Sequence, residues 1–346
     1  MEKLHVGQIG IGGMGKWHLR AISKSDMVEL VAICDINREL LNKKARELGV
    51  EAYEDYKDLL ENRNVEACVV VLPHWLYPEV VSYAAKRGVH ILKEKPLART
   101  FREAKVMVDA AEAAGIKLMV ATQRRYAETF SRVPELLRAG EIGDVFIVRG
   151  HYIFNIPGED FGWRSWRKKA GGGALLDPGY HIVDLLVWYV GLPVSVYCVM
   201  GYKGKPGAKY DTEDSAIVVM KYENGTIGYV FSSWASENSK PEEETIMLHG
   251  TKGSLKVDWT GLQIHYVDGY EKKYTALLDY EKPSLPQLWD RALLRQLNHF
   301  ARCVLEDKEP LSSGKENLMT MRVIEAAYRS EATGSPVALA TIKPHT

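Results

Sequence analysis

The sequence has no excess of charge of either sign. Its 45 Lys and Arg balance 45 Asp and Glu, which gives a formal net charge of zero. Such a balance favours neither nucleic acid nor an anionic membrane as a partner. Cysteine is scarce, with 4 residues and no Cys-x-x-Cys pair. We therefore expect no disulfide framework and no zinc site, and a reducing, cytoplasmic compartment.

Long apolar runs are also missing. No stretch approaches the roughly 20 apolar residues of a membrane span, and the first residues carry too short an apolar run for a secretory signal. The 346 residues are instead enough for two domains, each with its own core. We expect a protein that involves no membrane.

The first motif lies in residues 4–22, which read as a strand, a glycine-rich turn and a helix. Gly10, Gly12 and Gly15 form G-x-G-x-x-G, a turn whose backbone can approach a pyrophosphate at the positive end of the helix. The next strand ends in Asp35, 20 residues after Gly15, where a carboxylate accepts hydrogen bonds from a ribose. The alternative is a plain glycine turn with an unrelated acidic loop residue. The order of strand, turn, helix, strand and Asp favours a dinucleotide site.

Strand and helix patterns continue to alternate up to about residue 124. Apolar runs at 65–73, 89–96 and 116–123 are typical of strands buried on both faces, and helical patterns separate them. This alternation predicts an α/β domain with a doubly wound parallel sheet, a Rossmann domain over residues 1–124. Lys95, in Glu94-Lys95-Pro96, follows the end of a predicted strand. Ligands bind at that edge of such sheets, so Lys95 is a site candidate rather than an ordinary surface lysine.

A second domain, residues 125–346, has a different pattern. Several strand-like runs between residues 144 and 267, with an Asn224-Gly225 hairpin signal, predict an α+β domain with a large, open, mainly antiparallel sheet. We expect helices at 288–307 and 316–334 to cover one face. The other face still carries Val, Tyr and Phe, which predicts a homodimer or homotetramer formed through this sheet, unless loops cover it.

The second motif is GGGALLDPGYHIVD, residues 171–184. Asp177 and His181 are four residues apart near a helix start, so their side chains can converge, and Asp184 lies on nearly the same face. A histidine beside carboxylates can serve as a proton acceptor near neutral pH. The alternatives are that Asp177 is only an N-cap and His181 an ordinary polar residue, or that the two form a metal pair. We predict no metal, since no further ligand cluster stands out.

The combination of G-x-G-x-x-G, Glu94-Lys95-Pro96 and GGG-x-x-x-D-x-G-x-H resembles the Gfo/Idh/MocA oxidoreductases, the family of glucose–fructose oxidoreductase and inositol 2-dehydrogenase. The likeness spans the chain, including WRSWRKKAGGG and the closing residues 313–339. It implies an NAD(P)-dependent dehydrogenase that moves a hydride between the nicotinamide and a hydroxyl-bearing carbon of a sugar, sugar derivative or inositol. His181 would be the general base, Lys95 a hydrogen-bonding and electrostatic stabiliser, and Asp177 an orienting group.

The resemblance also implies binding residues and a cis Lys95–Pro96 bond. The expected cofactor-binding residues are Gly10, Gly12, Gly13, Met14, Gly15, Asp35, Arg38, Pro73, Glu94, Lys95 and Gln123, and the expected substrate-binding residues are Arg124, Asn155 and Trp163.

Two features of the sequence bear on this expectation. Asp35 would repel a 2′-phosphate and favours NAD, although Arg38 could compensate, so NADP stays an alternative. Relatives often read T-P-N-x-x-H after the fourth strand, where this chain has His74 and Tyr77 in place of the Asn and His, with Trp75 between them. These side chains could reshape the pocket lip or face solvent. Two other functions stay open: an NAD-dependent glycosidase that uses transient oxidation, and a non-enzymatic nucleotide-sensing regulator.

Overall fold

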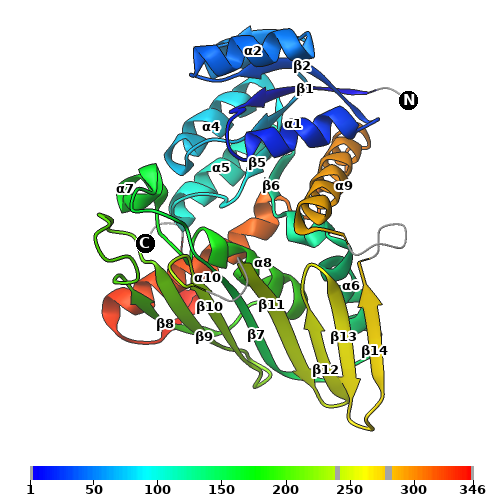
Figure 1. Cartoon of the computed structure of the whole chain (residues 1–346), viewed down its shortest axis with the longest axis vertical. Coiled ribbons are helices and arrows are strands. Elements are labelled where there is room, and N and C mark those ends of the chain that lie inside the picture. The colour runs from blue at the N-terminus through cyan, green and yellow to red at the C-terminus, as the bar shows by residue number, and fades with distance from the viewer. Residues whose placement is uncertain (1–2, 238–241, 277–282, 344–346) are drawn as a thin grey trace. The chain divides into compact units, whose positions relative to one another are not determined.

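A computed structural model describes residues 3–237, 242–276 and 283–343 of the chain (Figure 1). The chain forms two compact units. The first unit consists of residues 1–98, 103–126 and 289–318, and the second of 99–102, 127–288 and 319–346. The change of unit near residue 126 lies close to the expected boundary at 124, but the chain returns to the first unit at residue 289. The first compact unit is therefore built from three separate stretches of the chain.

The first unit contains the expected parallel sheet. Its six strands lie in the order β3-β2-β1-β4-β5-β6, and every neighbouring pair is parallel. Their bounds are β1 Leu4–Ile9, β2 Val28–Cys34, β3 Glu51–Tyr53, β4 Ala67–Val70, β5 His90–Glu94 and β6 Leu118–Ala121. The short strand β3 was not predicted, because three residues are too few for a periodic pattern.

Helices cover both faces of this sheet, as the doubly wound prediction requires. They are α1 Gly15–Lys24, α2 Arg38–Leu48, α3 Tyr56–Glu61, α4 Tyr77–Arg87, α5 Phe101–Ala113 and α9 Leu285–Leu305. Val6 of β1 belongs to a core cluster with side chains of α1 and α9. A Cβ on the adjacent Gly7 would lie 2.8 Å from Leu59 of α3. Since successive strand residues point to opposite faces, α3 covers the face opposite α1 and α9.

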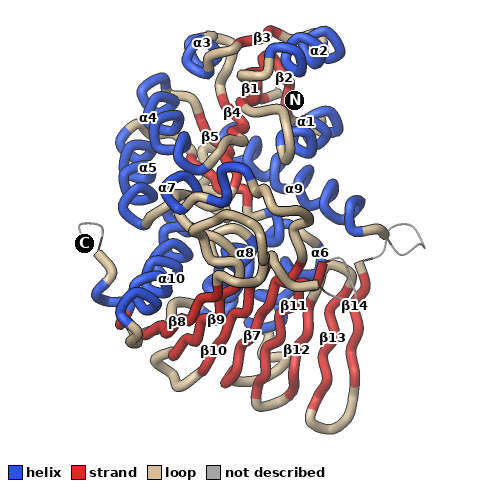
Figure 2. The backbone as a smooth tube through the Cα atoms, turned by 60° about the vertical axis from the view of Figure 1, so that its left-hand side comes forward, coloured by secondary structure: helices blue, strands red, loops and turns tan. Residues whose placement is uncertain are grey.

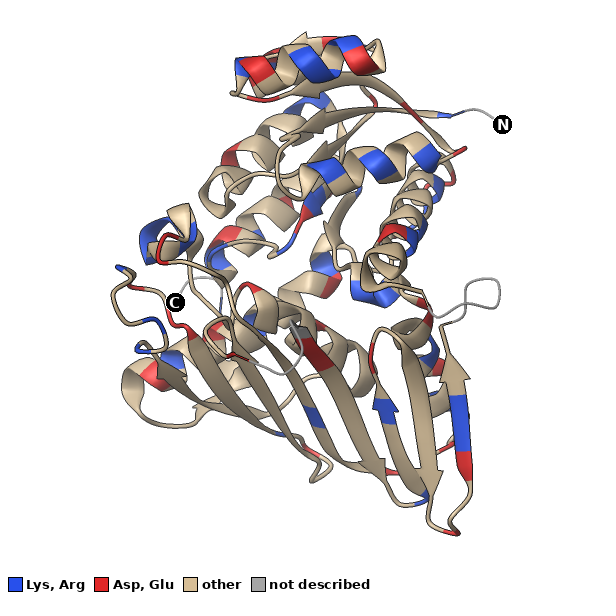
Figure 3. Ribbon diagram, viewed as in Figure 1, with Lys and Arg blue, Asp and Glu red and all other residues tan. Residues whose placement is uncertain are grey.

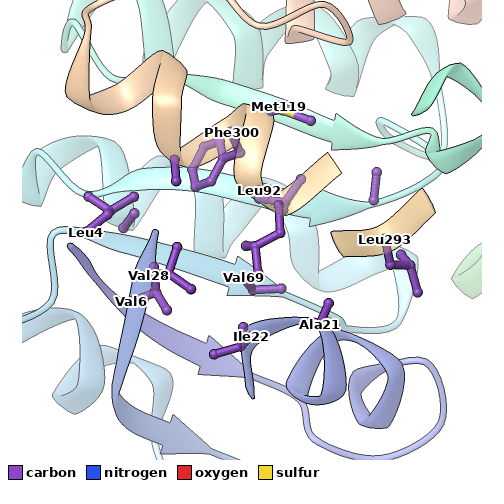
Figure 4. Close-up of a cluster of buried hydrophobic side chains, with 14 of the residues drawn as sticks. Leu4, Val6, Ala21, Ile22, Val28, Val69, Leu92, Met119, Leu293 and Phe300 are labelled. Carbon is purple, nitrogen blue, oxygen red and sulfur yellow. The ribbon is translucent and has the colours of Figure 1, made fainter. Parts of the chain in front are cut away.

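Helix α9 corrects one prediction. We expected residues 288–307 to cover the antiparallel sheet, but Leu293, Leu297 and Phe300 are buried in the core of the first unit. Figure 4 shows Leu293 and Phe300 beside Val69 and Leu92 of the parallel sheet. The periodicity identified an amphipathic helix, but an apolar stripe does not specify which sheet it meets.

The second unit contains the large sheet. Its nine strands lie in the order β14-β13-β12-β11-β7-β10-β9-β8-β15, of which Figure 2 shows β14 to β8 side by side. Only the β7–β10 pair is parallel. The strands are β7 Val145–Phe154, β8 Ser195–Gly201, β9 Ser215–Lys221, β10 Ile227–Ser233, β11 Glu242–Gly250, β12 Gly253–Val257, β13 Gly261–Tyr266, β14 Glu271–Thr275 and β15 Val337–Ala338. The mainly antiparallel prediction is confirmed, and Asn224-Gly225 does connect β9 to β10. The edge strands β14 and β15 were not predicted.

One face of the large sheet is covered by helices and the other carries apolar side chains. The helices of this unit include α6 Glu128–Arg138, α7 Arg167–Ala170, α8 Pro178–Val190 and α10 Gly314–Thr333. Helix α8 packs so closely on β7 that a Cβ on Gly150 would lie 2.4 Å from Ile182. Strands β8 and β9 alternate buried and exposed residues. Among the described residues, no helix is long and apolar enough to cross a membrane.

Candidate active site

The three motif glycines of the first unit have three different physical roles. Gly10 has φ +84°, and a Cβ there would lie 1.9 Å from the carbonyl oxygen of Val71 in the neighbouring chain segment. A Cβ on Gly15 would lie 2.2 Å from the Gly10 carbonyl oxygen, whereas a Cβ on Gly12 would meet nothing within 4 Å. The fold itself therefore requires glycine at 10 and 15. A Cβ on Gly12 would instead point into open space, and such space is needed where a pyrophosphate approaches the backbone.

The turn is held by side chains on both sides. Gln8, which sequence reasoning missed, donates from Nε2 to the carbonyl oxygens of Gly10 (3.0 Å) and Gly15 (2.8 Å). Asp35 at the end of β2 accepts from the Ile11 backbone N–H at 3.0 Å. Helix α1 follows Met14 without a side-chain cap at its N-terminus. The positive end of α1 and the turn, which includes Gly13, together make a site suited to a phosphate group.

The carboxylate of Asp35 is fixed through both of its oxygens. Oδ2 accepts from Ile11, and Oδ1 accepts from the Asn37 backbone N–H at 2.9 Å. Each oxygen keeps a second lone pair that can accept from a ribose hydroxyl. Arg38 forms an ion pair with Glu54 (Nε–Oε2 2.7 Å). This pair is exposed on both sides and therefore weak, so the preference for NAD rests on Asp35.

The Glu94-Lys95-Pro96 motif begins at the last residue of β5, and its Lys95–Pro96 peptide bond is cis, as expected. Glu94 is buried, and its carboxylate contacts Nε2 of His18 in α1 at 2.8 Å. Lys95 is half-buried. The Glu94–His18 contact connects this motif to the helix that follows the glycine turn. His18 was not singled out from the sequence, because a contact between residues 76 positions apart leaves no local pattern.

Of the three departures after β4, Trp75 is half-buried and the other two are buried. His74 and Tyr77 are buried, 4% and 1% exposed, with ring centroids 6.4 Å apart. Pro73 is half-buried and precedes the 3-10 helix His74–Leu76.

Gln123 and Arg124 are buried in the 3-10 helix Gln123–Tyr126 after β6. The Arg124 guanidinium lies 5.7 Å from the Trp289 ring centroid of α9, which gives this arginine a structural contact within the first unit.

The GGG loop of the second unit is packed tightly against buried groups. A Cβ on Gly172 would lie 1.7 Å from the Tyr328 hydroxyl, and one on Gly173 would lie 1.9 Å from the Glu213 carbonyl oxygen. The Glu213 carboxylate accepts from the backbone N–H of Gly173 (2.8 Å) and Leu175 (3.1 Å) and from the Tyr328 hydroxyl (2.7 Å). Glu213 is fully buried, and burial raises the pKa of its carboxyl. It fixes the loop that leads into Asp177.

Asp177 and His181 lie at the start of α8, as expected. Asp177 is the N-cap residue of α8, as the alternative held, but its side chain makes no cap hydrogen bond. Its carboxylate pairs with Arg164 (Oδ2–Nε 2.9 Å). His181 is 3% exposed, and its ring centroid lies 6.3 Å from that of Tyr152 in β7. Asp184 accepts from the Thr320 hydroxyl at 3.2 Å. Within the described ranges no group of His, Cys, Asp and Glu is arranged to hold a metal ion.

The remaining substrate candidates also lie in the second unit. The Trp163 ring centroid is 4.4 Å from the Arg164 guanidinium carbon, so Arg164 connects Trp163 with Asp177. Asn155 hydrogen-bonds the side chains of Lys205 and Glu237. Arg164 was missed as a partner of Asp177, although the WRSWR run contains it. The structure thus brings Trp163, Arg164 and Asp177 together and gives Asn155 a separate polar cluster.

Comparison with known proteins agrees with this geometry. A family model described as the NAD-binding Rossmann fold of an oxidoreductase family matches residues 4–122, and one described as the C-terminal alpha/beta domain of that family matches residues 134–339. The chain belongs to this oxidoreductase family, the Gfo/Idh/MocA family. The expected enzyme class, an oxidoreductase, is confirmed, and residues 4–122 match an NAD-binding domain.

The similarity to these proteins extends over almost the whole chain. D-apiose dehydrogenase of Paraburkholderia graminis is 28% identical over 343 residues, 97% of this chain and 89% of that protein. D-xylose 1-dehydrogenase (NADP(+)) 2 of Haloferax volcanii is 29% identical over 337 residues, 96% of this chain and 99% of that protein. A levoglucosan dehydrogenase solved in complex with NADH has a TM-score of 0.89 at 25% identity, covering 99% of this chain and 100% of that one.

Proposed function

We propose that this oxidoreductase is an NAD-dependent dehydrogenase of a sugar, sugar derivative or cyclic polyol. The observation that carries the proposal is the NAD-type turn, with open space at Gly12 and a doubly anchored Asp35, in a chain that also holds a buried histidine beside Asp177. The similar dehydrogenases named above act on sugars by their names, and this supports the substrate class.

In the proposed reaction, NAD held at the glycine turn and Asp35 would supply the hydride acceptor for the carbon that bears the reacting hydroxyl. His181 accepts the hydroxyl proton, so that the carbon–oxygen single bond becomes a carbonyl. The Lys95 ammonium donates a hydrogen bond to the same oxygen and stabilises the negative charge that develops on it. Asp177, itself held by Arg164, orients the substrate hydroxyls. In the reverse direction, His181 returns the proton to the oxygen.

Gly10, Gly12, Gly13, Met14 and Gly15 would hold the pyrophosphate, and Asp35 the adenosine ribose. We extend the cofactor site to Arg38, Pro73, Glu94, Lys95 and Gln123, and the substrate site to Arg124, Asn155 and Trp163. Arg38 and Glu94 are proposed to act through their neighbours, since Arg38 pairs with Glu54 and Glu94 with His18. Arg164 joins the substrate site as the partner of Asp177.

The test is NADH formation at 340 nm with NAD or NADP and a panel of D-apiose, D-xylose, levoglucosan, inositols, uronic acids and glycosides. We expect a signal with one stereochemical subset and a preference for NAD. Lys95→Met and His181→Ala should each lower kcat by roughly 10²–10⁴. The matched controls Lys256→Met and His265→Ala remove exposed side chains of β12 and β13 and should leave kcat unchanged.

Normal turnover in Lys95→Met or His181→Ala would refute the assigned roles. If glycosides are cleaved while no NADH accumulates, chromatography of the products would assign the protein to glycosidases with transient oxidation. If NAD binds by calorimetry and no compound reacts, the dehydrogenase proposal is wrong.

We further propose that a second copy of the chain covers the outer face of β8, β9 and β10. Val199 (53% exposed), Ile217 (50%) and Val219 (47%) belong to this face, and Tyr229 pairs with Val219 across the strands. Figure 3 shows few charged residues on these strands, whereas β14 carries Glu and Lys. An apolar face of this kind can pack against itself across a two-fold axis. Val219→Glu should reduce the mass measured by light scattering, whereas Gln263→Glu on β13 should not, and a monomeric wild type would contradict the proposal.

A further inference from the structure

Lys93, the last-but-one residue of β5, is a fully buried lysine with 0% exposure. Its ammonium group donates to three backbone carbonyl oxygens, those of Glu94 (2.6 Å), Pro96 (2.5 Å) and Leu97 (3.0 Å). These carbonyls belong to residues on both sides of Lys95. The side chain of Lys93 thus bridges the short segment that carries Lys95, the proposed electrostatic stabiliser.

The chemistry of this contact fits an ammonium ion. An ammonium has three N–H groups, one for each carbonyl, whereas a neutral amine would have only two. The Tyr77 ring centroid lies 3.6 Å from Nζ, in position for a cation–π interaction. Burial lowers the pKa of Lys93 well below its ordinary value, and the neighbouring Glu94 carboxylate acts in the opposite direction. Three carbonyl dipoles and an aromatic face offset the cost of burying the charge.

Other contacts connect this arrangement to the surrounding loops of the first unit. The Tyr77 hydroxyl accepts from the Leu72 backbone N–H at 3.4 Å, in the segment between β4 and the 3-10 helix. The Glu94 side chain contacts His18 of α1 at 2.8 Å. The backbone on either side of Lys95 is therefore tied to β4's loop through Lys93 and Tyr77, and to α1 through Glu94 and His18.

We propose that Lys93 is a positioning residue for Lys95: its ammonium fixes the Glu94–Leu97 backbone in the conformation that presents Lys95 to the substrate oxygen. The inference rests on the proposed function of Lys95. A catalytic group misplaced by about 1 Å can lose roughly 10²-fold in rate. An isosteric but uncharged side chain at 93 would leave three buried carbonyls without this donor, and the segment would shift to satisfy them.

The first test is a double-mutant cycle on the sugar of the panel that gives the fastest NADH formation. Lys93→Met should lower kcat by about 10–100-fold while changing the calorimetric Kd for NAD by less than about 3-fold. Lys95→Met should lower kcat as well. If Lys93 acts through Lys95, adding Lys93→Met to Lys95→Met should lower kcat little further. Independent, multiplying losses would overturn the positioning role.

The same cycle separates the inference from the proposed function. Unchanged turnover in Lys95→Met would refute the role of Lys95 itself. A large loss in Lys95→Met with normal turnover in Lys93→Met would refute only the inference. Lys93→Gln, which keeps two N–H donors, should restore part of the rate lost in Lys93→Met, and it replaces Lys93→Met in the cycle if the methionine variant does not fold.

The second test needs no substrate. Hydrogen–deuterium exchange of the NAD-bound protein, followed by mass spectrometry, reports on the amides of Glu94, Lys95, Leu97 and Ala98. In Lys93→Met or Lys93→Gln these amides should exchange at least about 10-fold faster, while peptides from β13 should exchange as in the wild type. Unchanged exchange at residues 94–98 would show that the ammonium does not hold the segment and would overturn the proposal.

Discussion

Replacing single glycines of the first turn separates two kinds of constraint, that of the fold and that of the cofactor. Gly10→Ala would place a Cβ 1.9 Å from the Val71 carbonyl oxygen, so the end of β4 must move by about 1 Å to reach the 3.0 Å that Cβ atoms tolerate. The alanine would also adopt φ near +84°. The left-handed conformation costs about 1–2 kcal/mol and overpacking about 1–3 kcal/mol. The variant should therefore lose about 2–5 kcal/mol of unfolding free energy.

The assay is thermal unfolding followed by calorimetric titration with NAD. At 2–4 °C per kcal/mol, the Tm of Gly10→Ala should fall by about 4–20 °C. Gly12→Ala is the matched control, because its Cβ meets nothing within 4 Å and its φ lies outside the left-handed region. Its Tm should stay within about 1 °C of the wild type, while its Kd for NAD rises at least about 10-fold, since the methyl group occupies space that a pyrophosphate needs. Normal NAD binding by Gly12→Ala, or wild-type stability of Gly10→Ala, would refute the reasoning.

Three further predictions concern carboxylates and their partners. Asp35→Ala removes the proposed ribose contact, so the ratio of kcat/KM for NAD over NADP should fall by at least about 10-fold; an unchanged ratio would argue against that contact. Arg164→Met removes the ion pair with Asp177 and should lower kcat about 10-fold. The Tm should change little, because a partly exposed pair contributes only about 0–1 kcal/mol to stability. Equal kcat values for variant and wild type would show that Arg164 does not belong to the site. For Glu213, burial raises the pKa in the folded state, so its contribution to stability is present below the ordinary value near 4.5 and is lost as pH rises through the raised pKa. Glu213→Gln should remove this dependence, and parallel curves of Tm against pH for variant and wild type would contradict it.

Sequence patterns predicted the features that local physics controls. The G-x-G-x-x-G turn, the alternation that gives a parallel sheet and the Asn224-Gly225 hairpin all depend on residues close together in the chain. The partners of the candidate site depend on distant residues. His18 contacts Glu94, which lies 76 positions further along the chain. Glu213 accepts a hydrogen bond from Gly173, which lies 40 positions before it. No periodicity or spacing identifies such pairs, so the supports of the motifs emerged only from the structure.

Helix α9 shows the same limit at the level of the fold. Its apolar stripe predicted a helix that packs on a sheet, and both sheets of this protein offer an apolar face to helices. Leu293 and Phe300 pack in the first unit, although the helix follows the last long strands of the second in the sequence. Tyr77 is a related case at the level of one residue, because only the structure shows its ring against the Lys93 ammonium.

The most direct test of hydride transfer uses a panel substrate that carries deuterium on the carbon of the reacting hydroxyl. Mass spectrometry of the nucleotide after one round of oxidation shows where that deuterium goes. The account predicts that the deuterium is recovered in the reduced nicotinamide and is absent from the carbonyl product. It also predicts that His181→Ala and Lys95→Met slow the transfer of deuterium. Deuterium released to water, with unlabelled NADH or none, would contradict the central claim that this protein moves a hydride from a hydroxyl-bearing carbon to NAD.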